Sequence, residues 1–390
     1  MSDVFSLPAV AYIAIPVALI IVWVLFSCKK EKQQSSFINS DYFKGLNYLL
    51  NDEQGKALDI FVKLVETNWD IIDTHFALGS IFRKNGEIDK AIKIHQGLMA
   101  RPSLPEKYRS KVLLELGYDY LGAGWFDRAE GLFKEVLIYD KQSIEARHNL
   151  ILIFQQEKDW HKAIDTAVDL FREDPSKIGP LIAQYYCELA EIAKVKGDVN
   201  QVDNNANQAL SFDANCVRAS LLLSSQSMEK GDYKSALRLL EQVEKQDYEF
   251  LPLIIEPLIE CYHQLQMSEE LLKYLSSLEK KYDDIFLLGK NVIAIDRYKG
   301  KEEATGYLLS KLKKQPSLQG LYLLLEHKNA SPDSIDQSLC KDMKEAVHIM
   351  QKDYVDYQCR QCGFQTNTLY WLCPTCQSWS HVKPSLVERS

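Results

Sequence analysis

The chain is 390 residues long, with 46% hydrophobic and 26% charged residues, which is the composition of a folded protein and not of a disordered one. Its formal net charge of −8 and the lack of any long lysine- or arginine-rich run argue against a nucleic-acid partner, because phosphate binding requires a clustered positive patch. A chain of this length holds two or three domains or one repeat array.

The first 28 residues predict a transmembrane anchor. No charged residue occurs from Leu7 to Ser27, and at 1.5 Å per residue this apolar segment is long enough to cross a hydrocarbon core of about 30 Å. A secretory signal peptide and a lipoprotein cleavage site at Cys28 are the alternatives, but the opening "MSDVFSL" lacks the basic residues that a signal peptide carries. We therefore expect residues 1–28 to contain a membrane-spanning helix.

Basic residues follow this segment at Lys29, Lys30 and Lys32, whereas none precedes it. The positive-inside rule then places the N-terminus outside and residues 29–390 in the cytoplasm. Residues 29–37 read as a short polar linker that keeps the following body close to the bilayer. The sequence thus predicts a single-pass membrane protein with a cytoplasmic body.

Residues 38–330 are predicted to form an all-α array of about eight tetratricopeptide-like helical pairs. The phrase "HFALGSIFRKNGEIDKAIKIHQGLM" at 75–99 recurs as "LLELGYDYLGAGWFDRAEGLFKEVL" at 113–137, with weaker copies further on. The residue that opens the second helix recurs at spacings of 34, 38, 34, 39, 34, 35 and 33, and a period near 34 is the tetratricopeptide signature. These anchor residues are Ala57, Ala91, Ala129, Ala163, Val202, Ala236, Leu271 and Ala304.

Stacked pairs of this kind form a superhelix whose inner groove is lined by the first helix of each pair. Such a groove suits an extended or helical peptide of a partner protein. A single residue on this face is more often an ordinary surface residue than a partner-binding one. We therefore predict partner binding for the residues as a set. The set is Tyr42, Phe76, Arg83, Lys84, Lys111, Tyr118, His148 and Gln155.

No catalytic motif accompanies the repeats. The chain contains no phosphate-binding loop, dinucleotide fingerprint, nucleophile elbow or H-E-x-x-H sequence, and its eight histidines are scattered. The sequence therefore predicts a binding protein without catalytic residues.

The tail "YQCRQCGFQTNTLYWLCPTCQSWS" predicts a metal site. Two C-x-x-C pairs can together bind one tetrahedral ion, with two thiolates from each pair. The expected ligands are therefore Cys359, Cys362, Cys373 and Cys376. Residues 357–390 are too few to fold on apolar burial alone, and the ion supplies the missing stability. We call this segment the metal tab; residues 331–356 are a helical connector. Aromatic residues that should wrap the tab or dock it on the repeats are Tyr357, Phe364, Tyr370, Trp371 and Trp379.

The other five cysteines have no metal-binding spacing. In helical or membrane patterns such residues are small buried hydrophobes, and a chain so poor in cysteine is not a disulfide scaffold. They are Cys28, Cys187, Cys216, Cys261 and Cys340.

The two knuckles resemble those of rubredoxins, in which four cysteines hold iron and transfer one electron. Gln377 stands where rubredoxins usually have glycine, and the loop between the knuckles is shorter. A closed four-thiolate shell also leaves no open position for hydrolysis. We therefore predict one structural metal ion, and favour zinc over iron.

A single-pass anchor, tetratricopeptide repeats and a four-cysteine tab, in this order, resemble the lipopolysaccharide assembly protein B family. The most specific pieces are "YQCRQCGF…TLYWLCPTCQSWS" and the placement of the anchor. The resemblance implies an inner-membrane protein with a periplasmic N-terminus and cytoplasmic repeats and tab. It further implies an adaptor for the membrane-bound AAA+ zinc protease that degrades the deacetylase of the lipid A pathway.

The same resemblance implies a third partner, an inner-membrane lipopolysaccharide sensor that contacts the anchor region and restrains the adaptor. Only the four tail cysteines carry over residue by residue. Two alternatives remain open: a membrane-tethered scaffold for lipopolysaccharide assembly or transport enzymes without a proteolytic role, and a rubredoxin-like iron protein that transfers electrons.

Overall fold

The structure is a computed structural model of the chain, and it describes residues 41–45, 47–48, 51, 53–67, 72–102, 104–282, 285–314, 318–329 and 355–385. The predicted anchor, the polar linker and nearly all of the helical connector lie outside these residues. Among the helices that are described, none is both long and apolar enough to cross a membrane.

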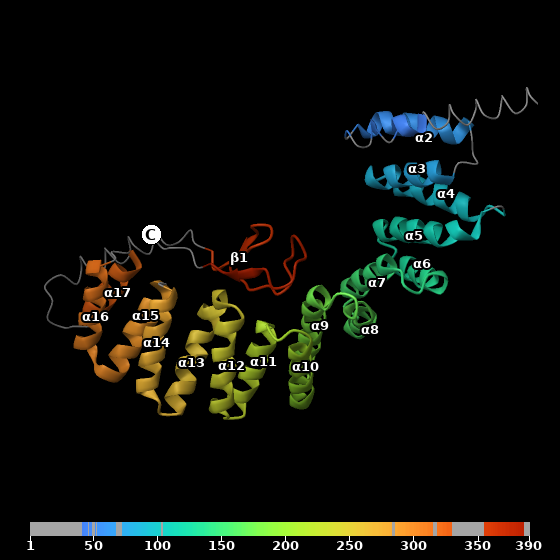
Figure 1. The fold of residues 1–390 in the computed structure, drawn as a ribbon. Coiled ribbons are helices and arrows are strands. Elements are labelled where there is room, and N and C mark those ends of the chain that lie inside the picture. Colours follow the sequence, from blue (N-terminus) through green and yellow to red (C-terminus); the bar gives the residue numbers. More distant parts are fainter. Residues whose placement is uncertain are drawn as a thin grey trace, which may run out of the picture. The chain divides into compact units, whose positions relative to one another are not determined.

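The chain divides into two compact units, residues 1–157 and 158–390. Unit 1 is helical throughout its described part, and neighbouring helices pack in antiparallel pairs (Figure 1). Its helices are α2 (Gln54–Thr67), α3 (Ile72–Lys84), α4 (Ile88–Met99), α5 (Glu106–Gly122), α6 (Phe126–Tyr139) and α7 (Ile144–Gln156).

Unit 2 continues with helices of similar length and ends in the metal tab. The helices are α8 (Trp160–Phe171), α9 (Pro175–Val195), α10 (Val199–Phe212), α11 (Val217–Glu229), α12 (Tyr233–Gln246), the short 3-10 helix η1 (Tyr248–Phe250), α13 (Leu251–Gln264), α14 (Ser268–Tyr282), α15 (Ile285–Lys299), α16 (Lys301–Lys314) and α17 (Leu318–Asn329). The strands of the tab are β1 (Tyr357–Cys359), β2 (Gln365–Thr366) and β3 (Val382–Pro384).

The eight residues predicted to open the second helix of each repeat fall one in each even-numbered helix from α2 to α16. Each of these repeat anchor residues is at most 1% exposed. The small side chains let the two helices of a pair approach closely. Gly117 in α5 shows how closely, because a Cβ atom there would lie 2.5 Å from the ring of Phe133 in α6. The tetratricopeptide fold predicted from the period is therefore confirmed.

One repeat replaces this aromatic ring with a polar one. Where α2 and α6 place Phe61 and Phe133, α4 has His95, which is fully buried. Its Nδ1 lies 2.5 Å from Oδ2 of the equally buried Asp119 in α5, and Arg83 Nη1 donates to Asp119 Oδ1 at 2.6 Å. This hydrogen-bonded cluster joins α3, α4 and α5 and adds polar contacts to their apolar packing.

Glycine and aspartate set the turn inside several repeats. Gly197 and Gly231 have positive φ angles of 74° and 77°, and the next residue in each turn is an aspartate. The side chains of Asp198 and Asp232 accept hydrogen bonds from backbone N–H groups of α10 and α12, which caps the second helix. Gln266 occupies the same turn position before α14, with φ of 58° although it is not glycine.

The isolated cysteines that the structure describes are buried, as predicted. Cys187 and Cys261 are inaccessible and Cys216 is almost so. The Sγ atoms of Cys187 and Cys216 lie 3.7 Å apart between α9 and the start of α11. Cys28 and Cys340 lie outside the described residues.

Gln266→Gly should stabilise the chain by about 1 kcal/mol, because a left-handed backbone is strained for a residue with a side chain and not for glycine. The matched control is Gly231→Gln at the equivalent turn, which should destabilise by a similar amount. Urea unfolding midpoints of the three proteins, with circular dichroism as the probe, test this. A lower midpoint for Gln266→Gly would contradict it.

Candidate metal centre and repeat groove

The metal tab is built around a small antiparallel sheet. The strand order is β2-β1-β3, and Cys359 at the end of β1 pairs with Val382 of β3. Each knuckle closes through the residue after its second cysteine: Gly363 N–H donates to Cys359 O, and Gln377 N–H donates to Cys373 O. Both residues have positive φ angles, 78° and 54°, so Gln377 adopts the conformation that glycine has in the first knuckle.

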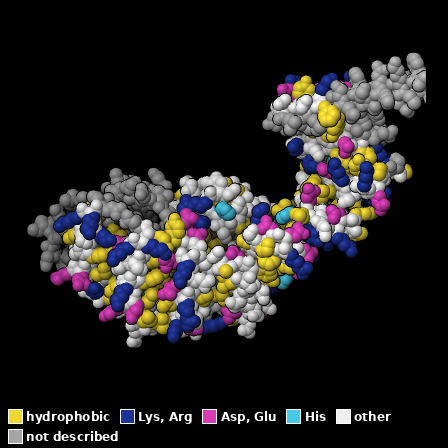
Figure 2. All heavy atoms as spheres, viewed as in Figure 1, with side chains coloured by type: hydrophobic (Ala, Val, Ile, Leu, Met, Phe, Trp, Pro, Cys, Tyr) yellow, Lys and Arg dark blue, Asp and Glu magenta, His cyan; other side chains and the backbone are white. Residues whose placement is uncertain are grey.

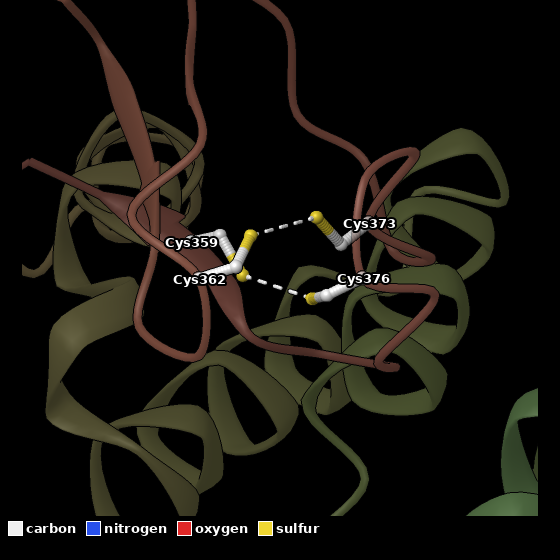
Figure 3. A group of neighbouring side chains, drawn as sticks. All are labelled: Cys359, Cys362, Cys373 and Cys376. Atoms are coloured by element: carbon white, nitrogen blue, oxygen red, sulfur yellow. Dashed lines mark hydrogen bonds between the residues drawn. The ribbon is translucent and has the colours of Figure 1, made fainter. Parts of the chain in front are cut away.

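The four predicted ligands converge on one point (Figure 3). The Sγ atoms of Cys359 and Cys376 lie 3.7 Å apart, those of Cys362 and Cys373 lie 3.8 Å apart, and all four lie within 4.8 Å of one another. A tetrahedral ion with metal–sulfur bonds of about 2.3 Å requires sulfur–sulfur distances of about 3.8 Å. The donors therefore fit one four-coordinate ion of the zinc or iron kind.

Local hydrogen bonds favour the thiolate form of Cys376. Cys376 Sγ lies 3.4 Å from Ser378 Oγ, and the hydroxyl and then the backbone N–H of Ser378 lower the pKa of the Cys376 thiol to about 6. Among the residues that the structure describes, these four cysteines are the one group of His, Cys, Asp or Glu side chains with metal-binding geometry.

Two tryptophans dock the tab on the helices of unit 2. Trp371 stacks on Phe250 of η1, with ring centroids 5.5 Å apart, and the Arg218 guanidinium lies 5.7 Å from the Trp371 ring. Trp379 packs edge-on against Trp160 of α8 and Tyr185 of α9, at 6.4 and 6.0 Å. The aromatic pairs bury apolar area that the tab could not bury by itself.

The remaining predicted aromatic residues stay within the tab. Tyr357 and Phe364 pack against the cysteine cluster, and Tyr370 contacts Phe364 while remaining partly exposed. The prediction that these five residues either wrap or dock the tab is confirmed, with docking limited to the two tryptophans.

Two basic residues of the tab form ion pairs with the segment that joins α12 to α13. Lys383 Nζ lies 2.6 Å from Asp247 Oδ2 and 2.7 Å from Glu249 Oε2, and Arg360 Nη2 lies 2.7 Å from Glu249 Oε1. Burial opposes the ionisation of Glu249, but hydrogen bonds from Lys383 and Arg360 lower its pKa below the usual value. Sequence reasoning missed these pairs, since no local pattern links residues so far apart in the chain.

The predicted groove residues all lie in unit 1, on helical residues 41–45 and on α3, α5 and α7. Two pairs of the set are in contact: Lys111 Nζ lies 4.4 Å from the ring centroid of Phe76, and the Arg83 guanidinium lies 5.4 Å from that of Tyr118. Lys84, Lys111 and His148 are exposed, and Tyr42, Arg83 and Tyr118 are partly buried.

Phe76 and Gln155 are only 5% and 8% exposed, so their side chains offer little surface to a partner. Arg83 is also committed within the chain, because it pairs with Glu115 and Asp119. The groove as a partner site thus stays a prediction, and its exposed cations are the members that could meet another protein. On the face that Figure 2 shows, basic side chains lie among acidic ones over the helices of unit 2.

Comparison with known proteins gives matches to the metal tab and to the helical repeats. The rubredoxin metal binding domain family matches residues 357–384, and the tetratricopeptide repeat family matches residues 74–107. A lipopolysaccharide assembly protein B from Escherichia coli (strain K12) is 32% identical over 379 residues, covering 96% of this chain and 97% of that protein. Another from Haemophilus influenzae is 29% identical over 392 residues, with the same coverage.

Among solved structures, that of Naa15/Naa10 bound to HypK-THB is similar with a TM-score of 0.42 and 15% identity. The match covers 82% of this chain and 52% of that one.

Cys373→Ser removes one of four thiolates and should lower metal affinity by at least about a hundredfold, with unfolding of the tab. Cys340→Ser, at a cysteine without metal-binding spacing, is the control. Elemental analysis gives the metal content and distinguishes zinc from iron, and hydrogen exchange of residues 357–384 reports the fold. Full metal content together with unchanged exchange would refute a structural role.

Lys383→Glu should weaken docking of the tab by about 3 kcal/mol, because it removes two charge-assisted hydrogen bonds and adds a like charge beside Asp247 and Glu249. Adding Asp247→Lys should restore part of the loss. Lys234→Glu, an exposed lysine on α12, is the control. The readout is hydrogen-exchange protection around β3 and η1, and equal protection in all variants would show that the ion pairs do not hold the tab.

Proposed function

This chain belongs to the lipopolysaccharide assembly protein B family, and from this membership we propose that it is an inner-membrane adaptor. As an adaptor it presents the deacetylase of the lipid A pathway to a membrane-bound AAA+ zinc protease, which degrades it. The similarity to this family extends over 96% of the chain and gives a role in lipopolysaccharide assembly. We propose in addition that the protein delivers a client to a protease.

The observation that supports the proposal is that the first helices of unit 1 expose side chains suited to binding another protein. In unit 1 the first helices α3, α5 and α7 bear exposed charged side chains beside aromatic rings, as at Lys111 and Phe76. Such surfaces suit recognition of a protein segment. Among the described residues of unit 1, the buried Asp119 pairs with Arg83 and His95, and this cluster has a structural role.

The predicted anchor explains how a weak contact becomes effective. A client bound to a membrane-tethered protein is confined near a protease in the same membrane, which raises its effective concentration without any new contact. The anchor within residues 1–28 is also the segment at which we propose that an inner-membrane lipopolysaccharide sensor restrains the adaptor.

The metal tab supports the array in this account. A folded tab lays Trp371 and Trp379 on α8, α9 and η1, so one ion stabilises contacts over several repeats of unit 2. Four thiolates close the shell, and the ion supplies structural stability and no open coordination position. We propose zinc for this site.

Depletion of the protein should lengthen the half-life of the lipid A pathway deacetylase several-fold, because its delivery to the protease is lost. Immunoblots after translation is stopped measure the half-life. The full chain should restore rapid turnover, whereas a chain that lacks residues 1–28 should restore it only weakly.

The second candidate, a scaffold for lipopolysaccharide assembly or transport enzymes, predicts a different result. An unchanged deacetylase half-life together with altered lipopolysaccharide composition would contradict the adaptor proposal and favour the scaffold.

A further inference from the structure

A cavity of about 620 Å³ opens between the first helices α5 and α7 of unit 1. Side chains of α5 form one wall, and the end of α6 together with the start of α7 forms the other. This volume accommodates a few side chains of a bound segment. The lining residues that matter for its chemistry are Lys107, Lys111, Leu114, Asp140, Ile144 and Glu145.

The α5 wall is basic. Lys111 Nζ lies 4.4 Å from the ring centroid of Phe76, and Lys107 Nζ lies 4.8 Å from that of Tyr108. Neither ammonium group forms an ion pair with a residue that the structure describes. The aromatic rings hold both cations in place, and the cations remain free to meet an acidic group.

The opposite wall is acidic. Asp140 Oδ1 accepts the backbone N–H of Gln142 at 3.1 Å, and no ion pair involving Asp140 or Glu145 occurs in the described part of unit 1. Between the walls, Leu114 is half-buried and Ile144 is 47% exposed. The cavity therefore presents a basic side, an apolar centre and an acidic side.

An equivalent position in unit 2 is covered by a segment of the same chain. Lys111, Glu145 and Arg218 each lie 18 residues before the anchor of their repeat, which is Ala129, Ala163 and Ala236 respectively. Arg218 is neutralised by Glu188 and Glu191 and lies against Trp371 of the metal tab, a segment of the same chain. In unit 1 no described segment of the chain lies on Lys111 or Glu145 in this way.

We propose that the cavity between α5 and α7 binds a short segment of the deacetylase in which an acidic side chain, an apolar side chain and a basic side chain face Lys107 and Lys111, Leu114 and Ile144, and Asp140 and Glu145 in turn. The inference rests on the proposed function and names the site and charge pattern of its client. A uniformly acidic or uniformly basic segment is disfavoured, because one wall would repel it. The acidic wall disfavours nucleic acid for the same reason.

The test is equilibrium binding of the purified deacetylase to the full chain held in lipid nanodiscs. Lys111→Glu should weaken binding about tenfold, since an attraction becomes a repulsion. Glu145→Lys should weaken it to a similar degree, and the loss should diminish as salt is added. Lys93→Glu, at an exposed lysine of α4, makes the same change in net charge as Lys111→Glu and should leave the affinity unchanged.

The possible results distinguish a wrong binding site from a wrong adaptor function. If the unaltered chain binds the deacetylase and neither Lys111→Glu nor Glu145→Lys changes the affinity, the site assignment is overturned while the adaptor proposal stands. Tighter binding by Glu145→Lys would overturn the mixed charge pattern in favour of an acidic segment. If the unaltered chain does not bind the deacetylase, the proposed function fails and the assignment fails with it.

Discussion

The close approach of the two helices in each repeat is the constraint on which the rest of this structure depends. Small or slender residues at the crossing, such as Gly117 against Phe133 and the buried anchor Ala129, allow that approach. One pair cannot bury its own apolar face, so the next pair must cover it. An array built in this way leaves a row of first helices with one open face, which is the surface that α3, α5 and α7 present.

The metal tab relies on a different source of stability. We propose that a bound ion holds its small sheet together. The tab adds two tryptophans and two basic residues to the surface of unit 2. Part of the surface beside α9 and α11 is thereby occupied by the chain itself. No described residue covers the surface between α5 and α7 in this way. This surface of unit 1 is therefore open to a partner.

Sequence reasoning reaches the features that depend on local spacing. The period near 34 identifies the helix pairs, and the C-x-x-C spacing identifies the four cysteines whose Sγ atoms converge. It does not reach contacts between distant segments: Arg360 and Glu249 are 111 residues apart, and Lys383 and Asp247 are 136 residues apart. It also overestimates the exposure of Phe76 and Gln155, because helical periodicity gives a face but not how deeply a neighbouring helix covers it.

The central claim is that this protein positions a client for a protease and performs no chemistry itself. The most direct measurement is the rate at which the reconstituted membrane protease degrades the purified deacetylase, with and without the full chain in the same membrane. The account predicts faster degradation that saturates as the amount of chain rises, and no degradation by the chain without the protease. An equal rate with and without the chain would contradict it.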